Sequence, residues 1–219
     1  IMSSDWSSDV CSSDLLDRLV SLRDYADFAR AFAGIAKAQS VWGTFGPTQG
    51  ILLTIAGPDG AEIADDSRLG RKFHDALERY RDPTVPFAVL NHRPLPFTVV
   101  AKVYYDSRYN PELIRKSVAG NLSARYSFES MRLGEAVTSA SLLEGLHGIN
   151  GIVGVDLDRL HRIDRPATRE TRIPAETGRV DPSGTAHPAE LLSLDARVLE
   201  QFDSHLSLYP VDPAPNENA

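Results

Sequence analysis

The stretch that decides the fold starts at Phe97–Asp106, which reads FTVVAKVYYD, and runs on to Tyr126. Within its first part, apolar side chains recur at every second position, and most of them are β-branched or aromatic. The side chains that share one face are Phe97, Val99, Ala101, Val103 and Tyr105. A period of two with this composition predicts a β-strand that buries one face.

A helix is predicted directly after this strand. Asn110 is a helix-capping residue, and Pro111 takes the first helical position, where a missing N–H costs nothing. A stripe of apolar residues follows at helical spacing: Ile114, Val118, Leu122 and Tyr126. Because this stripe and the buried face of the strand both need cover, we predict that they pack together as half of a small α+β layer.

Residues 16–93 predict a module with the element order α-β-β-α-β. Ser21 and Asp24 have the spacing of a capping box, at the start of a helix that Gly34 ends. Strands are predicted over residues 36–44, 51–55 and 87–91, and a second helix carries Leu69, Phe73, Leu77 and Tyr80. The run 51–55 is almost entirely apolar, so we expect it to be buried.

Residues 94–165 predict a second module with the order β-α-α-β, after a stiff junction at Pro94–Pro96. Thr138 or Ser139 caps its second helix, which Gly148 closes. A strand is predicted over residues 152–157, and residues 160–163 are its partner or its continuation. We expect an α+β fold class, with two small α/β two-layer modules of the ferredoxin-like kind in tandem.

Residues 166–219 predict a Pro-rich extended tail. Half of the chain's 14 prolines lie here, namely Pro166, Pro174, Pro182, Pro188, Pro210, Pro213 and Pro215. Its apolar anchor is the segment 189–195, with Leu191, Leu192 and Leu194, and Val198, Phe202 and Leu206 could add one short helix. A segment of this composition does not fold alone, so we expect the anchor to dock on a neighbouring module or subunit.

Residues 1–15 form a leader that repeats Ser-Ser-Asp without any apolar period. Asp5–Leu15 resembles the conceptual translation of a common DNA-sequencing adapter, and we expect it to contribute nothing to the fold. The alternative is a disordered Ser-rich tail. Cys11, the only cysteine, belongs to this leader, which excludes disulfides, thiol catalysis and Cys-based zinc sites from the rest. We expect the remainder to be the C-terminal fragment of a longer protein.

The composition argues against two classes of function, nucleic-acid binding and spanning a membrane. The chain is 42% apolar and 24% charged, as in an ordinary globular protein, and its formal net charge is -7. An acidic chain lacks the surplus of Lys and Arg that neutralises phosphates, so nucleic acid is not an expected partner. No apolar run approaches the ~18 residues of a membrane span.

The search for catalytic motifs finds none in a credible setting. Gly-x-Ser-x-Gly, Ser-x-x-Lys, the Walker pattern and Gly-x-Gly-x-x-Gly after a strand are all missing. Gly148, Gly151 and Gly154 suggest a phosphate loop, but they lead into a strand instead of opening a helix. We interpret them as a tight turn before a buried strand.

Titratable residues do not form a convincing site either. The histidines are scattered: His74, His92, His147, His161, His187 and His205. His161 with Asp156, Asp158 and Asp164 is the one metal-like cluster, and a solvated strand end with mixed charges is the favoured interpretation. A carboxylate pair could come from Glu112, Glu129, Glu135 and Glu144, and a binding box from Tyr104, Tyr105, Tyr109 and Tyr126. We expect core and rim roles for these tyrosines, and surface pairing of Arg115 and Lys116 with Glu112.

Several short sequence segments of the chain together resemble one known family. They are 24–30, 81–83, 94–97, 101–103, 106–112, 128–129, 133–137, 149–158 and 188–192. In this order and spacing, from Leu16 to about Asp195, they resemble the C-terminal part of the baseplate J-like family of baseplate assembly proteins. This family belongs to contractile phage tails and to phage-tail-like injection systems.

The resemblance implies a structural baseplate wedge subunit, made in the bacterial cytoplasm and built into a tail or tail-like particle. The implied partners are other wedge subunits and further copies of the chain. It implies no enzyme activity, catalytic residue, cofactor, metal, nucleic acid, membrane span or small-molecule substrate. The alternative is a small α+β enzyme or ligand-binding module, which would need a pocket with converging polar groups and a titratable residue of shifted pKa.

Overall fold

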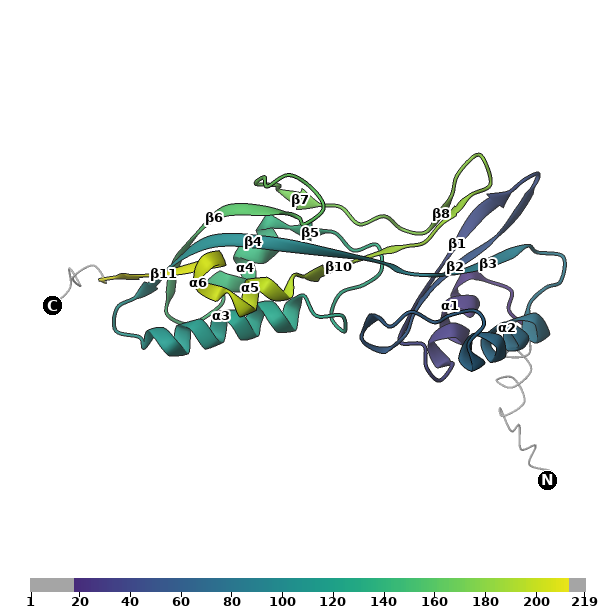
Figure 1. Ribbon diagram of the computed structural model, residues 1–219, viewed down its shortest axis with the longest axis horizontal. Helices are drawn as coiled ribbons and strands as arrows, with labels where there is room; N and C mark the ends of the chain where they lie inside the picture. The colour runs from purple at the N-terminus through teal and green to yellow at the C-terminus, as the bar shows by residue number, and fades with distance from the viewer. Residues whose placement is uncertain (1–17, 213–219) are drawn as a thin grey trace, which may run out of the picture. The chain divides into compact units, whose positions relative to one another are not determined.

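The computed structural model describes residues 18–212, so the leader predicted over residues 1–15 lies outside the described part. The fold is mixed α+β with several small sheets, as the sequence predicts (Figure 1). The chain divides into two compact units. Unit 1 comprises the described residues up to His92 together with Gly178–Pro188, and unit 2 comprises Arg93–Thr177 and the residues from Ala189 onward.

Unit 1 is a three-stranded sheet with helices on one face. Its elements are α1 (Leu22–Ala31), β1 (Lys37–Phe45), β2 (Thr48–Ala56), the 3-10 turn η2 (Pro58–Gly60), α2 (Arg68–Tyr80), β3 (Phe87–Asn91), β8 (Arg179–Val180) and β9 (Ala186–His187). The sheet order is β1-β2-β3, with β1 antiparallel and β3 parallel to β2. The short strands β8 and β9 form an antiparallel hairpin.

Local sequence signals explain the helices of unit 1. The capping box is confirmed, because the Ser21 side chain accepts from the Asp24 N–H while the Asp24 carboxylate accepts from the Ser21 N–H. The face of α1 that carries Tyr25 and Ala29 packs with Phe73 of α2 in the core. The predicted buried strand is also confirmed, since β2 is buried from Gly50 to Ala56.

Unit 2 is organised around one long strand. Its elements are β4 (Arg93–Asp106), α3 (Pro111–Arg125), β5 (Val137–Thr138), α4 (Ser139–His147), β6 (Ile152–Arg162), β7 (Arg172–Ile173), β10 (Glu190–Leu194), α5 (Ala196–Glu200), α6 (Phe202–His205) and β11 (Leu206–Val211). In the main sheet β4 pairs antiparallel with β6 and parallel with both β10 and β11. A second small sheet joins β5 to β7.

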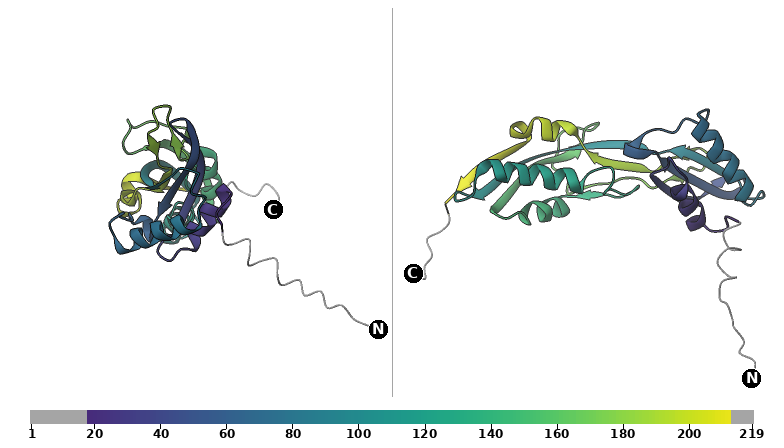
Figure 2. Two further views of the ribbon diagram at one scale, coloured as in Figure 1. Left: turned by 90° about the vertical axis from the view of Figure 1, so that its right-hand side faces the viewer. Right: turned by 90° about the horizontal axis from the view of Figure 1, so that it is seen from below.

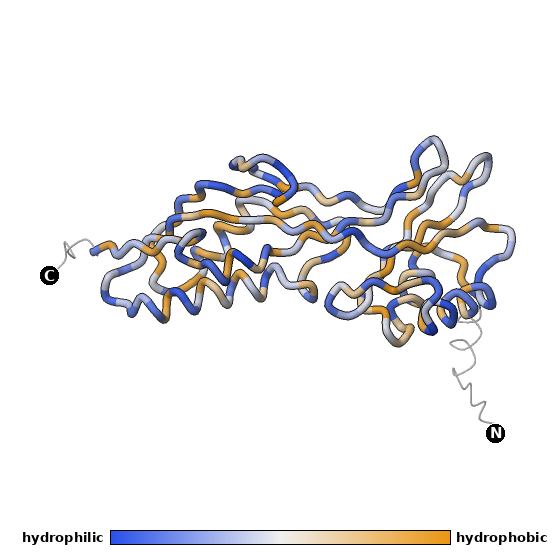
Figure 3. Tube along the Cα trace, viewed as in Figure 1, coloured by the Kyte–Doolittle hydropathy of each residue, from blue (hydrophilic) through white to orange (hydrophobic). Residues whose placement is uncertain are grey.

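The predicted strand and helix form the core of unit 2. Phe97, Val99 and Val103 on β4 are each 0% exposed, and so is Val118 on α3. Seen from below in Figure 2, α3 lies against the sheet, and Figure 3 shows apolar residues recurring along both elements. The Asn110 side chain accepts from the Glu112 N–H at 2.8 Å, which confirms the predicted cap.

The boundary predicted between the two modules, after Arg93, lies one residue from the division between the two units. Pro94–Pro96 is not a separate junction, however, because these residues lie inside β4 and pair with β10. The Arg93 N–H donates to the Ala189 carbonyl at 3.0 Å, so alternate residues of β4 direct their N–H groups toward β10. Pro94 and Pro96 are two residues apart, so both place their missing N–H on the other edge. Proline is tolerated there because the ladder with β10 loses no hydrogen bond.

The predicted extended tail is also wrong. The segment 166–212 supplies β10 and β11 to the main sheet of unit 2 and the hairpin β8–β9 to unit 1. Leu191 and Leu192 are 3% and 0% exposed, as core residues of unit 2 are. Two short helices replace the single one expected, and Leu206 begins β11. Residues 160–162 continue β6.

The sheets do not have the ferredoxin-like arrangement either. That arrangement has a four-stranded antiparallel sheet, whereas β2–β3, β4–β10 and β4–β11 are parallel pairs. The parallel pairs arise because α2 connects β2 to β3, and because the distant segment 190–211 returns alongside β4.

Candidate interaction surface

The metal-like cluster of the sequence is separated in the structure. Asp156 and Asp158 lie 3.7 and 3.4 Å from the Lys102 ammonium, across the strand pair β4–β6. Asp164 forms a pair of hydrogen bonds with the Arg162 guanidinium, which holds the pKa of that carboxyl below its usual range. His161 is buried, with Nδ1 2.9 Å from the Arg162 carbonyl. Among the described residues, no group of three or more His, Cys, Asp or Glu could hold a metal ion.

The remaining histidines lie on separate elements. His74 is on α2, His92 precedes β4, His147 ends α4, His187 is on β9 and His205 ends α6. His147 Nδ1 lies 2.8 Å from the Leu143 carbonyl in α4, and His205 Nδ1 lies 3.2 Å from the carbonyl of Gln201, the residue before α6. His187 lies 3.2 Å from the Asp181 carboxylate. Burial lowers the pKa of His92.

The acidic and basic candidates form ordinary ion pairs. Glu135 pairs with Arg132, and Glu144 of α4 pairs with Arg125 of α3. Arg115 does not pair with Glu112 as expected. Its guanidinium pairs with Asp203 and lies 4.7 Å from the ring centroid of Phe202, because α6 packs beside α3.

The tyrosines have the core and rim roles that the sequence predicts. Tyr105 and Tyr126 are 7% and 4% exposed, whereas Tyr109 is 45% exposed. The Tyr104 ring stacks on Tyr209 of β11, with centroids 5.6 Å apart. Gly151 has a φ of +92°, which fits the predicted tight turn before β6.

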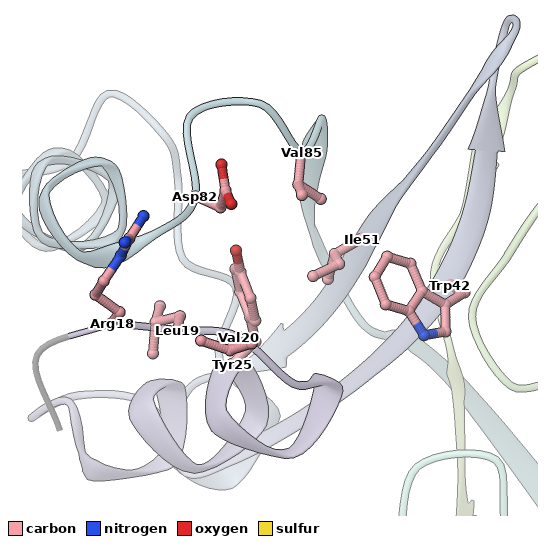
Figure 4. Close-up of a pocket in the computed structure, with 8 residues that line it drawn as sticks. All are labelled: Arg18, Leu19, Val20, Tyr25, Trp42, Ile51, Asp82 and Val85. Atoms are coloured by element: carbon pink, nitrogen blue, oxygen red, sulfur yellow. The ribbon is translucent and has the colours of Figure 1, made fainter. Parts of the chain in front are cut away.

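Unit 1 carries a mainly apolar groove of about 410 Å³ (Figure 4). It is lined by Arg18, Leu19, Val20, Tyr25, Trp42, Ile51, Asp82 and Val85. Trp42 lies directly opposite Ile51 in the β1–β2 register. Ile51 is 1% exposed, but Trp42 is 51% and Val20 74% exposed. A partly exposed indole and an exposed valine therefore lie on the walls of one groove, and exposed apolar side chains that lie together are common on surfaces that bind other proteins.

The polar groups of the groove are held in place by their own neighbours. Burial raises the pKa of the Tyr25 phenol, which is therefore neutral. The Thr84 hydroxyl and N–H donate to the Asp82 carboxylate at 2.7 and 2.8 Å and lower its pKa. The groove is suited to burying an apolar side chain of a partner.

The sequence did not single out this groove. Val41 and Trp42 are adjacent apolar residues in the predicted strand 36–44, so the alternation does not tell which of them is open. Trp42 is exposed although its cross-strand neighbour Ile51 belongs to the core of unit 1.

No helix within residues 18–212 has the length and apolar character needed to cross a membrane. Residues 17–90 match the family model for the Baseplate J-like central domain. A search of curated proteins found no match. Among solved structures, one similar chain comes from the "Cryo-EM structure of the anti-feeding prophage (AFP) baseplate, 6-fold symmetrised", with a TM-score of 0.58 and 14% sequence identity.

The match to that baseplate chain covers 82% of the present chain and 38% of the other, so the present chain spans well under half of its length. At this identity the likeness shows a shared fold. The family match covers most of unit 1 and agrees with the resemblance seen in the sequence. Residues 17–90 of the chain are thus similar to the central domain of the Baseplate J-like family.

Proposed function

We propose that this chain is a structural component of the baseplate wedge in a contractile phage tail or phage-tail-like injection system. The observation that carries the proposal is the Baseplate J-like central domain at residues 17–90. The fold that the chain shares with a chain of the anti-feeding prophage baseplate supports it. The protein works by holding neighbouring subunits in a fixed geometry, without a catalytic residue, metal or cofactor.

The proposed partners are other baseplate subunits and further copies of the chain, assembled after synthesis in the bacterial cytoplasm. The groove of Trp42 and Val20 is the surface of unit 1 through which we propose that one such subunit docks. Its occupant is an apolar side chain of a neighbouring baseplate subunit. A tryptophan at the centre of an interface commonly contributes 2 kcal/mol or more to binding, on the order of a thirtyfold change in affinity.

The test is a Trp42→Ser variant in the full baseplate system, with co-purification of the neighbouring subunits as the readout. Because Trp42 is 51% exposed, the variant is expected to fold, with a thermal midpoint close to that of the parent chain. Recovery of the partner subunits should fall by about tenfold or more.

Val153→Ser is the matched control. It removes an apolar side chain that is 60% exposed on β6 of unit 2, and it should leave the recovery of the partners that dock on the groove unchanged. Normal assembly by a well-folded Trp42→Ser variant would reject the groove as a docking surface. Failure of the parent chain itself to co-purify with any baseplate subunit would reject the proposed function.

A further inference from the structure

The outer face of the β1–β2 hairpin is defined here by Val41, Gly43, Leu52 and Thr54. It is buried at Leu52 and Thr54 and partly buried at Val41 and Gly43, although α1 and α2 do not cover it. The core that the helices cover contains Ile51, Leu53 and Ile55 on the other face of β2. Leu52 and Thr54 point away from that core, and each is 0% exposed. Another part of the chain must therefore cover the outer face.

The segment Gly178–Pro188 supplies this cover. The Gly178 N–H donates to Gln39 Oε1 at 3.2 Å. A Cβ placed on Gly178 would lie 3.4 Å from Leu52 Cδ2, and a Cβ placed on Gly43 would lie only 2.2 Å from Val180 Cγ2. The Val180 side chain thus packs directly on the backbone of Gly43, where any other residue would push it away.

The covering hairpin has a turn that holds its own shape. The Asp181 carboxylate accepts hydrogen bonds from the Ser183 and Thr185 N–H groups at 3.0 and 2.9 Å, and His187 Nε2 lies 3.2 Å away. Gly184 adopts a φ of +86°, which glycine adopts without strain. A preformed turn loses little conformational entropy when it docks.

Both arms of this hairpin lead out of unit 1. Glu176 and Glu190 flank the hairpin in the chain and bind each other. The Glu190 N–H donates to the Glu176 carbonyl, and the Glu176 N–H donates to the Glu190 carboxylate, each at 2.8 Å. Glu190 also opens β10, where it stands opposite Arg93 of β4. The hairpin is therefore continuous in the chain with an edge strand of unit 2.

We propose that the hairpin Gly178–Pro188 is a latch that completes the Baseplate J-like domain. The family match ends at residue 90, so the segment that it covers lacks the piece that buries its outer face. The domain closes only when a segment about ninety residues further along the chain docks on β1 and β2. Undocking the latch exposes the outer face and loosens unit 1, while the core of unit 2 stays intact.

The test is a double-mutant cycle in the full chain with Gly43→Ala and Val180→Gly. Gly43→Ala drives a methyl group into Val180 and should speed hydrogen exchange of the β2 peptide 49–56 by about tenfold or more. Val180→Gly alone should also speed this exchange, because it removes the latch contact. In the Val180→Gly background, Gly43→Ala should add less than about twofold, because the clash has gone. Exchange of the β4 peptide 97–105 should not change in any of the three variants.

Gly154→Ala is the matched control, because Gly154 is a strand glycine in unit 2. A Cβ placed on it would lie 3.8 Å from its nearest neighbour, Tyr104 Cδ2, which is ordinary van der Waals contact. It should leave peptide 49–56 unchanged. The latch would be refuted if Gly43→Ala had the same effect in both backgrounds, if Val180→Gly left peptide 49–56 unchanged, or if peptides 49–56 and 97–105 changed together. The cycle does not involve Trp42, so its failure and failure of the groove as a docking surface are distinguishable.

Discussion

Leu192→Ala tests whether the C-terminal segment is part of the unit 2 core. Leu192 is 0% exposed on β10 and stands opposite Leu95 in the parallel pair with β4. The change removes three carbon atoms from a fully buried site, which loses about 0.8 kcal/mol for each in transfer free energy and leaves a cavity. The free energy of unfolding should fall by about 3 kcal/mol, a large part of the 5–15 kcal/mol typical of a domain.

Hydrogen exchange of peptide 97–105 measures this change directly, since β4 is protected until unit 2 opens. A loss of about 3 kcal/mol corresponds to exchange about 140-fold faster. Leu113→Ala is the control, because Leu113 is 64% exposed on α3 and its truncation should change exchange by about twofold or less. If Leu192→Ala had no larger effect than Leu113→Ala, the segment would be a docked tail and not core.

Two further predictions concern pH. Burial lowers the pKa of His92 in the folded state, so unit 1 should lose stability as pH falls below the unfolded value of about 6.5, and His92→Gln should remove this dependence in urea titrations at pH 5 and 7. If His92→Gln kept the same pH dependence of stability, a titratable group other than His92 would be its source. The Ser183 hydroxyl and His187 lower the pKa of Asp181, so the turn is stabilised above the unfolded value of about 3.9 and weakens as pH falls below it. Exchange of residues 178–188 should therefore rise in acid for the parent chain but not for Asp181→Asn, and equal acid sensitivity of the two chains would contradict this.

The local elements of the fold could be predicted because their signals are local. The period of two over Phe97–Tyr105 and the four-residue spacing from Ile114 to Tyr126 each tell which side chains will be buried. The caps at Ser21 and Asn110 are equally local, since the capping side chain reaches a backbone N–H only two or three residues away.

The candidate groove could not be predicted in the same way. Its walls come from α1 and the segment before it, from β1 and β2, and from the loop after α2. The sequence shows that Trp42 lies in a strand, but its exposure depends on which neighbours come near it in space. Only the packed unit shows that an exposed tryptophan and an exposed valine line one groove.

The sequence by itself determined the order of the main helices and strands up to β6, the buried faces of β4 and α3, and the likeness to the Baseplate J-like family. The tertiary structure alone decided where residues 166–212 go. Their prolines and short apolar runs suggested an extended tail, yet β10 and β11 pair with β4 and the hairpin Gly178–Pro188 covers β1 and β2. A periodic pattern encodes that a face is buried but not which distant segment buries it, because that choice depends on pairings between residues far apart in the chain.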